Sequence, residues 1–187
     1  PPFLTTLRKR EGMGARALEL VILTACRSGE VRGAAWPEID LQSRLWRIPA
    51  DRMKSGKEHQ IPLSTAAIGL LKTIPRLDGS ELLFPSTSAG KISDMTLTAV
   101  LRRMDVDATV HGFRSSFKDW CRNCTKYPDE VSELQLAHVN NDATRAAYAR
   151  DELLPQRTRL MQQWCQFLNS KQQSAKVVPI AGFNTEH

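Results

Sequence analysis

Apolar residues recur at helical spacing along most of this chain, and the first such segment, residues 15–25, is apolar on almost every side. A pattern of this kind is typical of a helix at the centre of a core. It breaks at Ser28-Gly29, and residues 30–36 predict a second, short helix. The first helix would therefore carry Arg27 out of the core, at the break between the two.

Three short β-prone segments follow, at residues 39–41, 45–48 and 59–63. Residues 42–44 and 54–57, which separate them, are turn-like in composition. Together these segments predict a small three-stranded antiparallel sheet.

The second half of the chain is helical again. Ser64-Thr65 and Ser93-Asp94 are plausible N-caps, for helices that reach about residues 74 and 104. From Phe113 onward the patterns are helical, with breaks at Tyr127-Pro128 and Asn140-Asn141. The expected fold is mainly α with the small sheet, in one domain, because 187 residues leave little room for a second domain of ordinary size.

A last amphipathic helix is predicted from Leu154-Pro155 to about residue 169. The residues on its apolar side are Leu160, Met161, Trp164, Phe167 and Leu168. This side suits either packing within the chain or docking on a neighbouring copy. Residues 170–187 are polar and lack a clear period, so we place the domain at residues 1–169 and expect a mobile tail after it.

Lysine and arginine outnumber aspartate and glutamate by 26 to 20, which gives a net charge of +6. This balance favours an anionic partner such as nucleic acid, although a basic protein without such a partner has the same composition. No apolar run approaches the roughly 20 residues that cross a bilayer, so we expect no association with a membrane. The chain shows no signal-peptide pattern, which favours the cytoplasm and reduced thiols.

Four cysteines are present, and Cys121 and Cys124 have the CxxC spacing of zinc and redox sites. No second CxxC and no pair of histidines completes a tetrahedral set in the sequence. The favoured interpretation is a coincidence of helical spacing, with zinc or redox chemistry as the alternative.

Tyr148 is the candidate with the most suggestive chemistry, because two basic clusters lie upstream, at residues 26–33 and 111–114, and His138 lies between them and the tyrosine. A tyrosine hydroxyl has a free pKa of roughly 10 and is a poor nucleophile at neutral pH. It needs fixed cations that stabilise the charge forming on its target. Each basic residue taken alone has a bland interpretation, as a solvated charge or a structural histidine.

Arginine suits a phosphate target, since its planar fork grips two oxygens and stays charged at all working pH values. Arg27, at a helix end, and Arg114, close to His111, are the natural pair. Glu30 is placed to orient the Arg27 guanidinium or to cap the short helix.

Arg27, His111-x-x-Arg114, His138 and Tyr148, in this order and at these separations, resemble the signature of the tyrosine recombinase (phage integrase) family. Residues 24–40 resemble the first box of integrases from prophages and genomic islands, and residues 52–64 resemble the β-hairpin lysine segment of the family. The resemblance spans about residues 15–168. Two departures, Ala137 in place of a common Gly and Ser28 in place of a common Pro, are both tolerable.

The resemblance implies a site-specific recombinase that works without metal, ATP or another cofactor. Tyr148 would attack a scissile DNA phosphate, form a 3′-phosphotyrosyl link and free a 5′-hydroxyl, so that strand exchange integrates or excises a mobile element. Arg27 and Arg114 would clamp the non-bridging oxygens, and His138 would add a hydrogen bond. His111 would act on the tyrosine proton, as a general base or as an orienting group.

Lys54 is the expected general acid that protonates the leaving 5′-oxygen, and Lys57, on the same turn, is its competitor. His59 falls on the return strand of the hairpin, where a structural role is favoured. Tyr127, the other tyrosine, lies in a helix-breaking turn ahead of His138, whereas the nucleophiles of this family follow that histidine.

The resemblance further implies double-stranded DNA with attachment sites as the partner, a homotetramer on DNA, and a monomer for the isolated domain. Similar integrases carry an N-terminal core-binding domain, and often an arm-binding domain, neither of which is present in these residues. Two other functions fit parts of the pattern: a DNA-binding module without catalysis, and a type IB topoisomerase, which uses similar chemistry to relax DNA.

Overall fold

The computed structural model describes residues 2–138 and 153–170 of the chain. Its α-helices, in chain order, are α1 (Pro2–Arg8), α2 (Met13–Thr24), α3 (Ser28–Arg32), α4 (Thr65–Thr73), α5 (Asp94–Arg103), α6 (Gly112–Cys124), α7 (Asp129–Gln135) and α9 (Leu154–Asn169). The strands are β1 (Ile39–Asp40), β2 (Leu45–Ile48) and β3 (His59–Pro62), and two 3₁₀ helices, η1 (Trp36–Glu38) and η2 (Ala50–Arg52), flank β1 and β2. The predicted fold class, mainly α with a small sheet, is confirmed.

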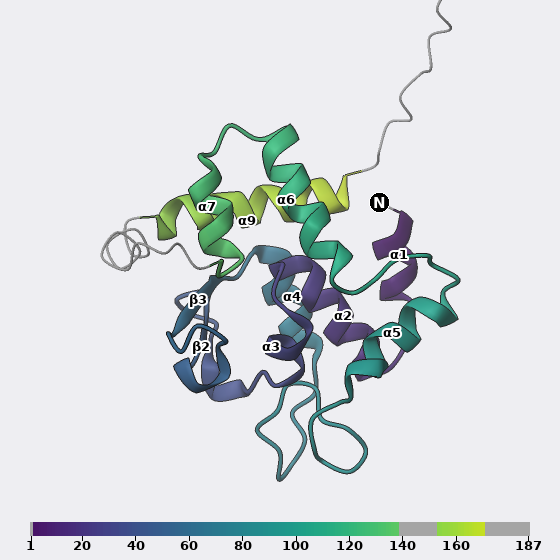
Figure 1. Cartoon of the computed structure of the whole chain (residues 1–187). Coiled ribbons are helices and arrows are strands. Elements are labelled where there is room, and N and C mark those ends of the chain that lie inside the picture. The colour runs from purple at the N-terminus through teal and green to yellow at the C-terminus, as the bar shows by residue number, and fades with distance from the viewer. Residues whose placement is uncertain (1, 139–152, 171–187) are drawn as a thin grey trace, which may run out of the picture.

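α2 is the central helix of the core (Figure 1). Every residue from 17 to 24 is buried, as the nearly uniform apolar pattern predicts. α1, α3, α4, α5, α6 and α9 all pack against it. Anything placed at the end of α2 is therefore held by most of the molecule.

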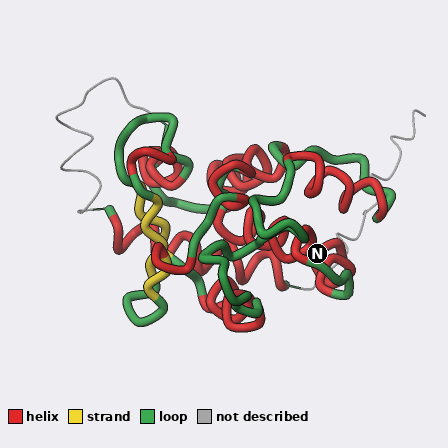
Figure 2. Tube along the Cα trace, turned by 90° about the horizontal axis from the view of Figure 1, so that it is seen from below, coloured by secondary structure: helices red, strands yellow, loops and turns green. Residues whose placement is uncertain are grey.

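The strands form one antiparallel sheet in the order β1-β2-β3, at one end of the molecule (Figure 2). In β2, Trp46 and Ile48 are buried while Arg47 between them is exposed, because successive side chains of a strand point to opposite faces. Trp46 pairs with Ile61 and Ile48 with His59. The connection from β2 to β3 begins with η2 and then carries Lys54 in an exposed turn.

α6, α7 and α9 lie together on one side of α2 (Figure 1). Aromatic rings join α6 to α9: Trp120 and Trp164 have ring centroids 5.1 Å apart, and Phe117 meets Trp164 edge-on at 5.4 Å. Of the two options for the last helix, this structure has the one in which it packs within its own chain.

The short helix after Arg27 has other bounds than the predicted residues 30–36. α3 begins at Ser28, because the Glu30 carboxylate accepts a hydrogen bond from the backbone N–H of Arg27 at 2.7 Å and caps the first turn. α3 ends at Arg32, four residues before the predicted end at residue 36, and residues 36–38 form η1 instead.

The remaining predictions concern the cap of α4, the break at Asn140-Asn141 and the C-terminal tail. Ser64 caps α4 through a hydrogen bond that its hydroxyl accepts from Ala67 N–H at 3.2 Å. The sequence made no prediction for α1. The predicted break at Asn140-Asn141 and nearly all of the predicted tail lie outside the described residues. Within the described ranges, no helix is both long enough and apolar enough to span a bilayer.

Candidate active site

The C-terminal end of α2 is buried, and side chains from three other helices bind its carbonyl groups. The last carbonyls of a helix have no partner inside it, so a buried end needs outside donors. The Trp164 indole donates to Ile22 O at 2.8 Å, and the Gln135 side-chain amide donates to Thr24 O at 3.0 Å. The Arg114 guanidinium donates to Ala25 O. Ala25 then turns the chain with a left-handed backbone, φ 56°, which places Arg27 just outside the core.

A pocket of about 450 Å³ opens at this point, between the start of α3, the β2–β3 turn and the start of α6. The residues predicted for catalysis that line it are Arg27, Lys54, His111 and Arg114, together with Glu30. Arg32, Arg52 and Asp94 also contribute to its wall. The pocket therefore has an excess of cations, as a phosphate site requires.

Arg27 is held by Glu30 through two contacts. One Glu30 carboxylate oxygen accepts the Arg27 backbone N–H at 2.7 Å, and the other accepts from Nη1 of its guanidinium at 2.9 Å. The Glu30 side chain is 7% exposed and the Arg27 side chain 33%. Glu30 thus both caps α3 and orients a guanidinium that keeps an open edge toward the pocket.

Arg114, in the first turn of α6, is 4% exposed. Its guanidinium donates from Nη1 to Ala25 O and from Nη2 to Leu136 O at 2.8 Å. Burial lowers the pKa of Arg114, and the charge of Arg27 adds to that effect, but the usual value is so high that Arg114 stays charged at neutral pH. The negative end of the α2 dipole favours a cation at this place.

His111 and Lys54 line the pocket wall with exposed side chains. His111 precedes α6, and its imidazole makes no hydrogen bond with any described residue. The Lys54 ammonium likewise has no hydrogen-bond or ionic partner in the described part of the chain. Lys57, the competitor, does not line the pocket.

His138 ends the described segment after α7 and is not part of the pocket wall. Its Nδ1 lies 2.7 Å from a Glu133 carboxylate oxygen, and Lys118 pairs with the other oxygen. Burial raises the pKa of Glu133, but hydrogen bonds from Lys118 and His138 outweigh it, so the pKa is below its usual value. With Nδ1 engaged, Nε2 is the ring nitrogen left for a ligand. Tyr148 lies outside the described residues.

Residues 5–153 match the model of the phage integrase family. The chain belongs to that family. Prophage integrase IntA of Escherichia coli K12 is 34% identical over 177 residues, which cover 91% of this chain and 43% of IntA. The integrase of Enterobacteria phage P4 is 36% identical over 191 residues, which cover 90% of this chain and 44% of that integrase. The chain thus spans less than half the length of these two relatives.

Solved structures share the fold at lower identity. The integrase from mycobacterium phage Brujita superposes with a TM-score of 0.65 at 15% identity, over 83% of this chain and 53% of that one. The lambda integrase catalytic core gives 0.54 at 20% identity, over 75% of this chain and 88% of that core. The fold of this chain is therefore that of an integrase catalytic core.

This chain has Ala137 where many members of the family have Gly, and the structure gives a reason for that preference. Ala137 has a left-handed backbone, φ 49°, which costs a residue with a Cβ more than it costs Gly. The conformation shows that the constraint is on the backbone that leads to His138.

Two arginines of the pocket wall were not predicted. Arg52 donates to the carbonyl of Glu30 and pairs with Glu38, so it ties the Lys54 turn to α3. A Cβ on Gly33 would lie 3.0 Å from the Arg52 guanidinium, which explains a residue without a side chain there. Arg32 pairs with Asp94 at 3.1 Å, and its buried Nε has no hydrogen-bond partner among the described residues. A signal for Arg52 was present, since it lies two residues before Lys54.

The other candidates lie away from the pocket. His59 is buried in β3, with Nε2 3.2 Å from Gln135 O, as a structural histidine would be. The Tyr127 hydroxyl accepts a hydrogen bond from Gln163 at 3.3 Å. Cys121 is buried and Cys124 exposed, and burial raises the pKa of Cys121 to about 12. The described residues contain no group of His, Cys, Asp and Glu able to hold a metal ion.

Proposed function

We propose that this chain is the catalytic domain of a site-specific DNA recombinase that cleaves and rejoins DNA through a 3′-phosphotyrosyl intermediate. The observation that carries the proposal is the pair of fixed guanidinium groups at one pocket. Glu30 holds Arg27, and two carbonyls hold Arg114. Cations held in advance stabilise the charge on a phosphoryl transition state without rearranging during the reaction.

In the proposed cleavage step, the Tyr148 hydroxyl oxygen attacks the scissile phosphorus in line with the 5′-oxygen. The new P–O(tyrosine) ester forms as the P–O5′ bond breaks, so the phosphodiester energy is kept for rejoining. Arg27 and Arg114 bind the non-bridging oxygens, and His138 donates to one of them through Nε2. The imidazole of His111, which has no hydrogen-bond partner among the described residues, receives or orients the tyrosine proton.

Lys54 supplies the proton to the leaving 5′-oxygen. Its exposed position on the pocket wall supports this role, because a general acid must reach its target and a flexible ammonium can do so. A leaving alkoxide without a proton would be a much poorer leaving group. Rejoining reverses the step, with the 5′-hydroxyl of a partner strand as nucleophile.

The partner is double-stranded DNA, in keeping with the net charge of +6. Among proteins of this fold, one lambda integrase structure is a tetramer bound to a Holliday junction, and a XerH recombinase structure is bound to its difH substrate. We propose the same kind of assembly for the protein that contains this chain: a homotetramer on paired attachment sites and a monomer without DNA.

The two competing functions make different demands. A DNA-binding module without catalysis does not need an oriented guanidinium pair beside an exposed lysine such as Lys54. A type IB topoisomerase needs the same groups, and it is distinguished by relaxing supercoiled DNA that lacks any attachment site. Family membership favours the recombinase.

The test uses the longest natural form of the protein that contains this chain and a nicked duplex carrying the attachment site of its element. Cleavage near the nick releases a short strand that diffuses away, so the covalent protein–DNA adduct accumulates and is seen as a shifted band. We expect an adduct with the unmodified protein and none with Tyr148→Phe.

Tyr127→Phe is the matched control, because it removes the other tyrosine hydroxyl and should leave the adduct intact. An adduct from Tyr148→Phe would show that the nucleophile is another residue. Loss of the adduct in both variants would point to a folding defect, which a thermal melt of each variant detects.

A further inference from the structure

Arg157 is a buried arginine on the apolar side of α9. It is 2% exposed, and its spacing to Leu160, Met161 and Trp164 places it on the same stripe as these core residues. A guanidinium loses its hydration when buried and remains there only with well-placed acceptors. An arginine at this place therefore has a specific set of contacts to maintain.

Two hydrogen bonds of Arg157 go to Gln135, the last residue of α7. Nε and Nη2 of Arg157 donate to the Gln135 side-chain oxygen at 3.2 and 3.1 Å, and Nη2 also donates to the carbonyl of Gln60 in β3. Three elements meet here: α9, α7 and the sheet.

Gln135 connects Arg157 to the C-terminal end of α2. With its oxygen held by Arg157, its amide nitrogen points to Thr24 and donates to that carbonyl at 3.0 Å. Its backbone carbonyl is bound by His59 at 3.2 Å. Both the side chain and the main chain of Gln135 are thus fixed, immediately before Leu136.

The two carbonyls that hold Arg114 are the neighbours of these two anchored points. Arg114 donates to Ala25 O, next to Thr24, and to Leu136 O, next to Gln135. Resting on the function proposed above, we infer that Arg157, acting through Gln135, is a positioning residue that sets where the Arg114 guanidinium lies. Arg157 does not line the pocket described above, so it is not assigned a catalytic role.

The first experiment measures positioning without any reaction. In the 187-residue chain, ¹⁵N NMR follows the Arg114 Nε–H signal, which Arg114→Lys identifies by its disappearance. We expect Arg157→Met to shift this signal by more than its linewidth and to speed its exchange with water at least tenfold. Arg157→Lys, which keeps the charge, should shift it less.

The matched control is Glu19→Gln, which weakens a buried ionic cluster elsewhere on α2. It should leave the Arg114 signal in place even where its Tm falls as far as that of Arg157→Met. An unchanged Arg114 signal in both Arg157 variants would overturn the inference. So would an equal shift in Glu19→Gln, since Arg157 would then have only a general effect on stability.

The second experiment measures the single-turnover rate of adduct formation, at a temperature where each variant is folded. We expect Arg157→Met to slow it about 10- to 100-fold while the Kd for DNA changes less than twofold. In an Arg114→Lys background the same substitution should cost less than threefold, because both changes disturb one guanidinium. Equal slowing in both backgrounds would contradict the inference. If the unmodified protein forms no adduct, the proposed function fails, and the NMR result still decides the positioning.

Discussion

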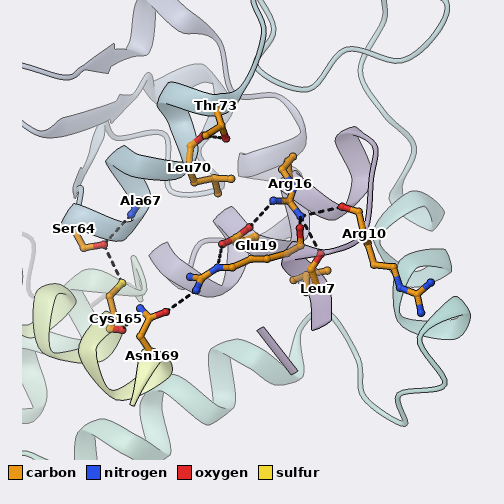
Figure 3. Close-up of polar contacts among 11 residues, drawn as sticks. Leu7, Arg10, Arg16, Glu19, Ser64, Ala67, Leu70, Thr73, Cys165 and Asn169 are labelled. Carbon is orange, nitrogen blue, oxygen red and sulfur yellow. Dashed lines mark hydrogen bonds and ion pairs between the residues drawn. The ribbon is translucent and has the colours of Figure 1, made fainter. Parts of the chain in front are cut away.

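α2 meets buried charge at two places, and the two are built differently. Midway along the helix, Glu19 is 3% exposed and lies 2.6 Å from Nε of Arg8 and 3.2 Å from Nη1 of Arg16. At its C-terminal end, Arg114 is 4% exposed and is held by backbone carbonyls. We call the first of these groups the Glu19 cluster: Glu19, Arg8, Arg16 and Asn169. Figure 3 labels Glu19, Arg16 and Asn169 of this cluster.

The Glu19 cluster closes on itself. Arg16 donates to the carbonyls at the end of α1, including Leu7 O at 2.9 Å, and Arg8 donates to Asn169 of α9 at 2.7 Å. The cluster joins three helices and neutralises its own carboxylate. At the pocket, by contrast, Arg114 is held by neutral acceptors and its charge stays available to a ligand. Buried charge that is neutralised internally stabilises the fold, whereas buried charge held by carbonyls can serve a site.

The largest expected effect on cleavage comes from replacing Arg114, at the pocket. Arg114→Lys keeps the charge but loses the planar fork that donates to Ala25 and Leu136 together. We expect the single-turnover cleavage rate to fall on the order of 10³-fold, within the range seen when a preorganised donor is removed from a transition state. The measurement is adduct formation on the nicked duplex.

Glu19→Gln is the counterpart at the other place. It should lower stability by about 2 kcal/mol, a fall in Tm of roughly 4–8 °C, because Arg8 and Arg16 lose their carboxylate. Its cleavage rate at a permissive temperature should match that of the unmodified protein. A cleavage defect in Glu19→Gln as large as that of Arg114→Lys would end the distinction between the two places.

Much of the fold and the two motif arginines of the pocket could be predicted from the sequence. The contacts that could not be predicted all join residues far apart along the chain. Apolar period predicted α2 and α9, and composition predicted the three strands. Arg27 and Arg114 stood out because they occur in short motifs. The partners of Arg52 and Arg157 were not predictable, since Glu30 and Gln60 lie far from them along the chain. An arginine on an apolar stripe was nevertheless a signal that Arg157 is buried.

The next effect in size concerns Lys54, the cation of the pocket without a described partner. We expect Lys54→Ala to slow cleavage about 100-fold, as the loss of a general acid typically does. In a substrate with sulfur in place of the bridging 5′-oxygen, the cleaved strand leaves as a 5′-thiolate. This leaving group needs no proton, because thiols are far more acidic than alcohols. That substrate should restore most of the rate to Lys54→Ala.

Lys57→Ala tests the competing assignment, because Lys57 lies on the same turn but outside the pocket wall. Its cleavage rate should be nearly unchanged, and sulfur substitution should give it no special benefit. If sulfur rescues Lys57→Ala and not Lys54→Ala, Lys57 is the general acid. The same substrate should not rescue Arg114→Lys, whose defect lies at the non-bridging oxygens.

The smallest effect is expected at Glu133, which combines features of the two places. Like Glu19 it is a carboxylate with two partners, here Lys118 and His138. Because His138 is assigned to the phosphate, Glu133 also supports the site. Its folded-state pKa is lowered, so the stability it contributes is present above the unfolded value of roughly 4.3 and is lost as pH falls through the folded pKa. Glu133→Gln should therefore lower Tm at pH 7 by roughly 2–4 °C, or about 1 kcal/mol.

That difference in Tm should shrink as the pH is lowered, and should vanish once the pH lies below the folded pKa of Glu133, where the carboxylate of the unmodified protein is protonated as well. Glu130→Gln, on the same helix but without an ionic partner among the described residues, should show a smaller difference at pH 7. The cleavage rate of Glu133→Gln shows whether Glu133 serves stability alone, as the Glu19 cluster does, or also serves the site, as Arg114 does. We expect Glu133→Gln to slow it roughly three- to tenfold, equivalent to about 1 kcal/mol, because His138 loses the acceptor that orients its ring. An unchanged rate would place Glu133 with the Glu19 cluster, as a contact that serves stability alone.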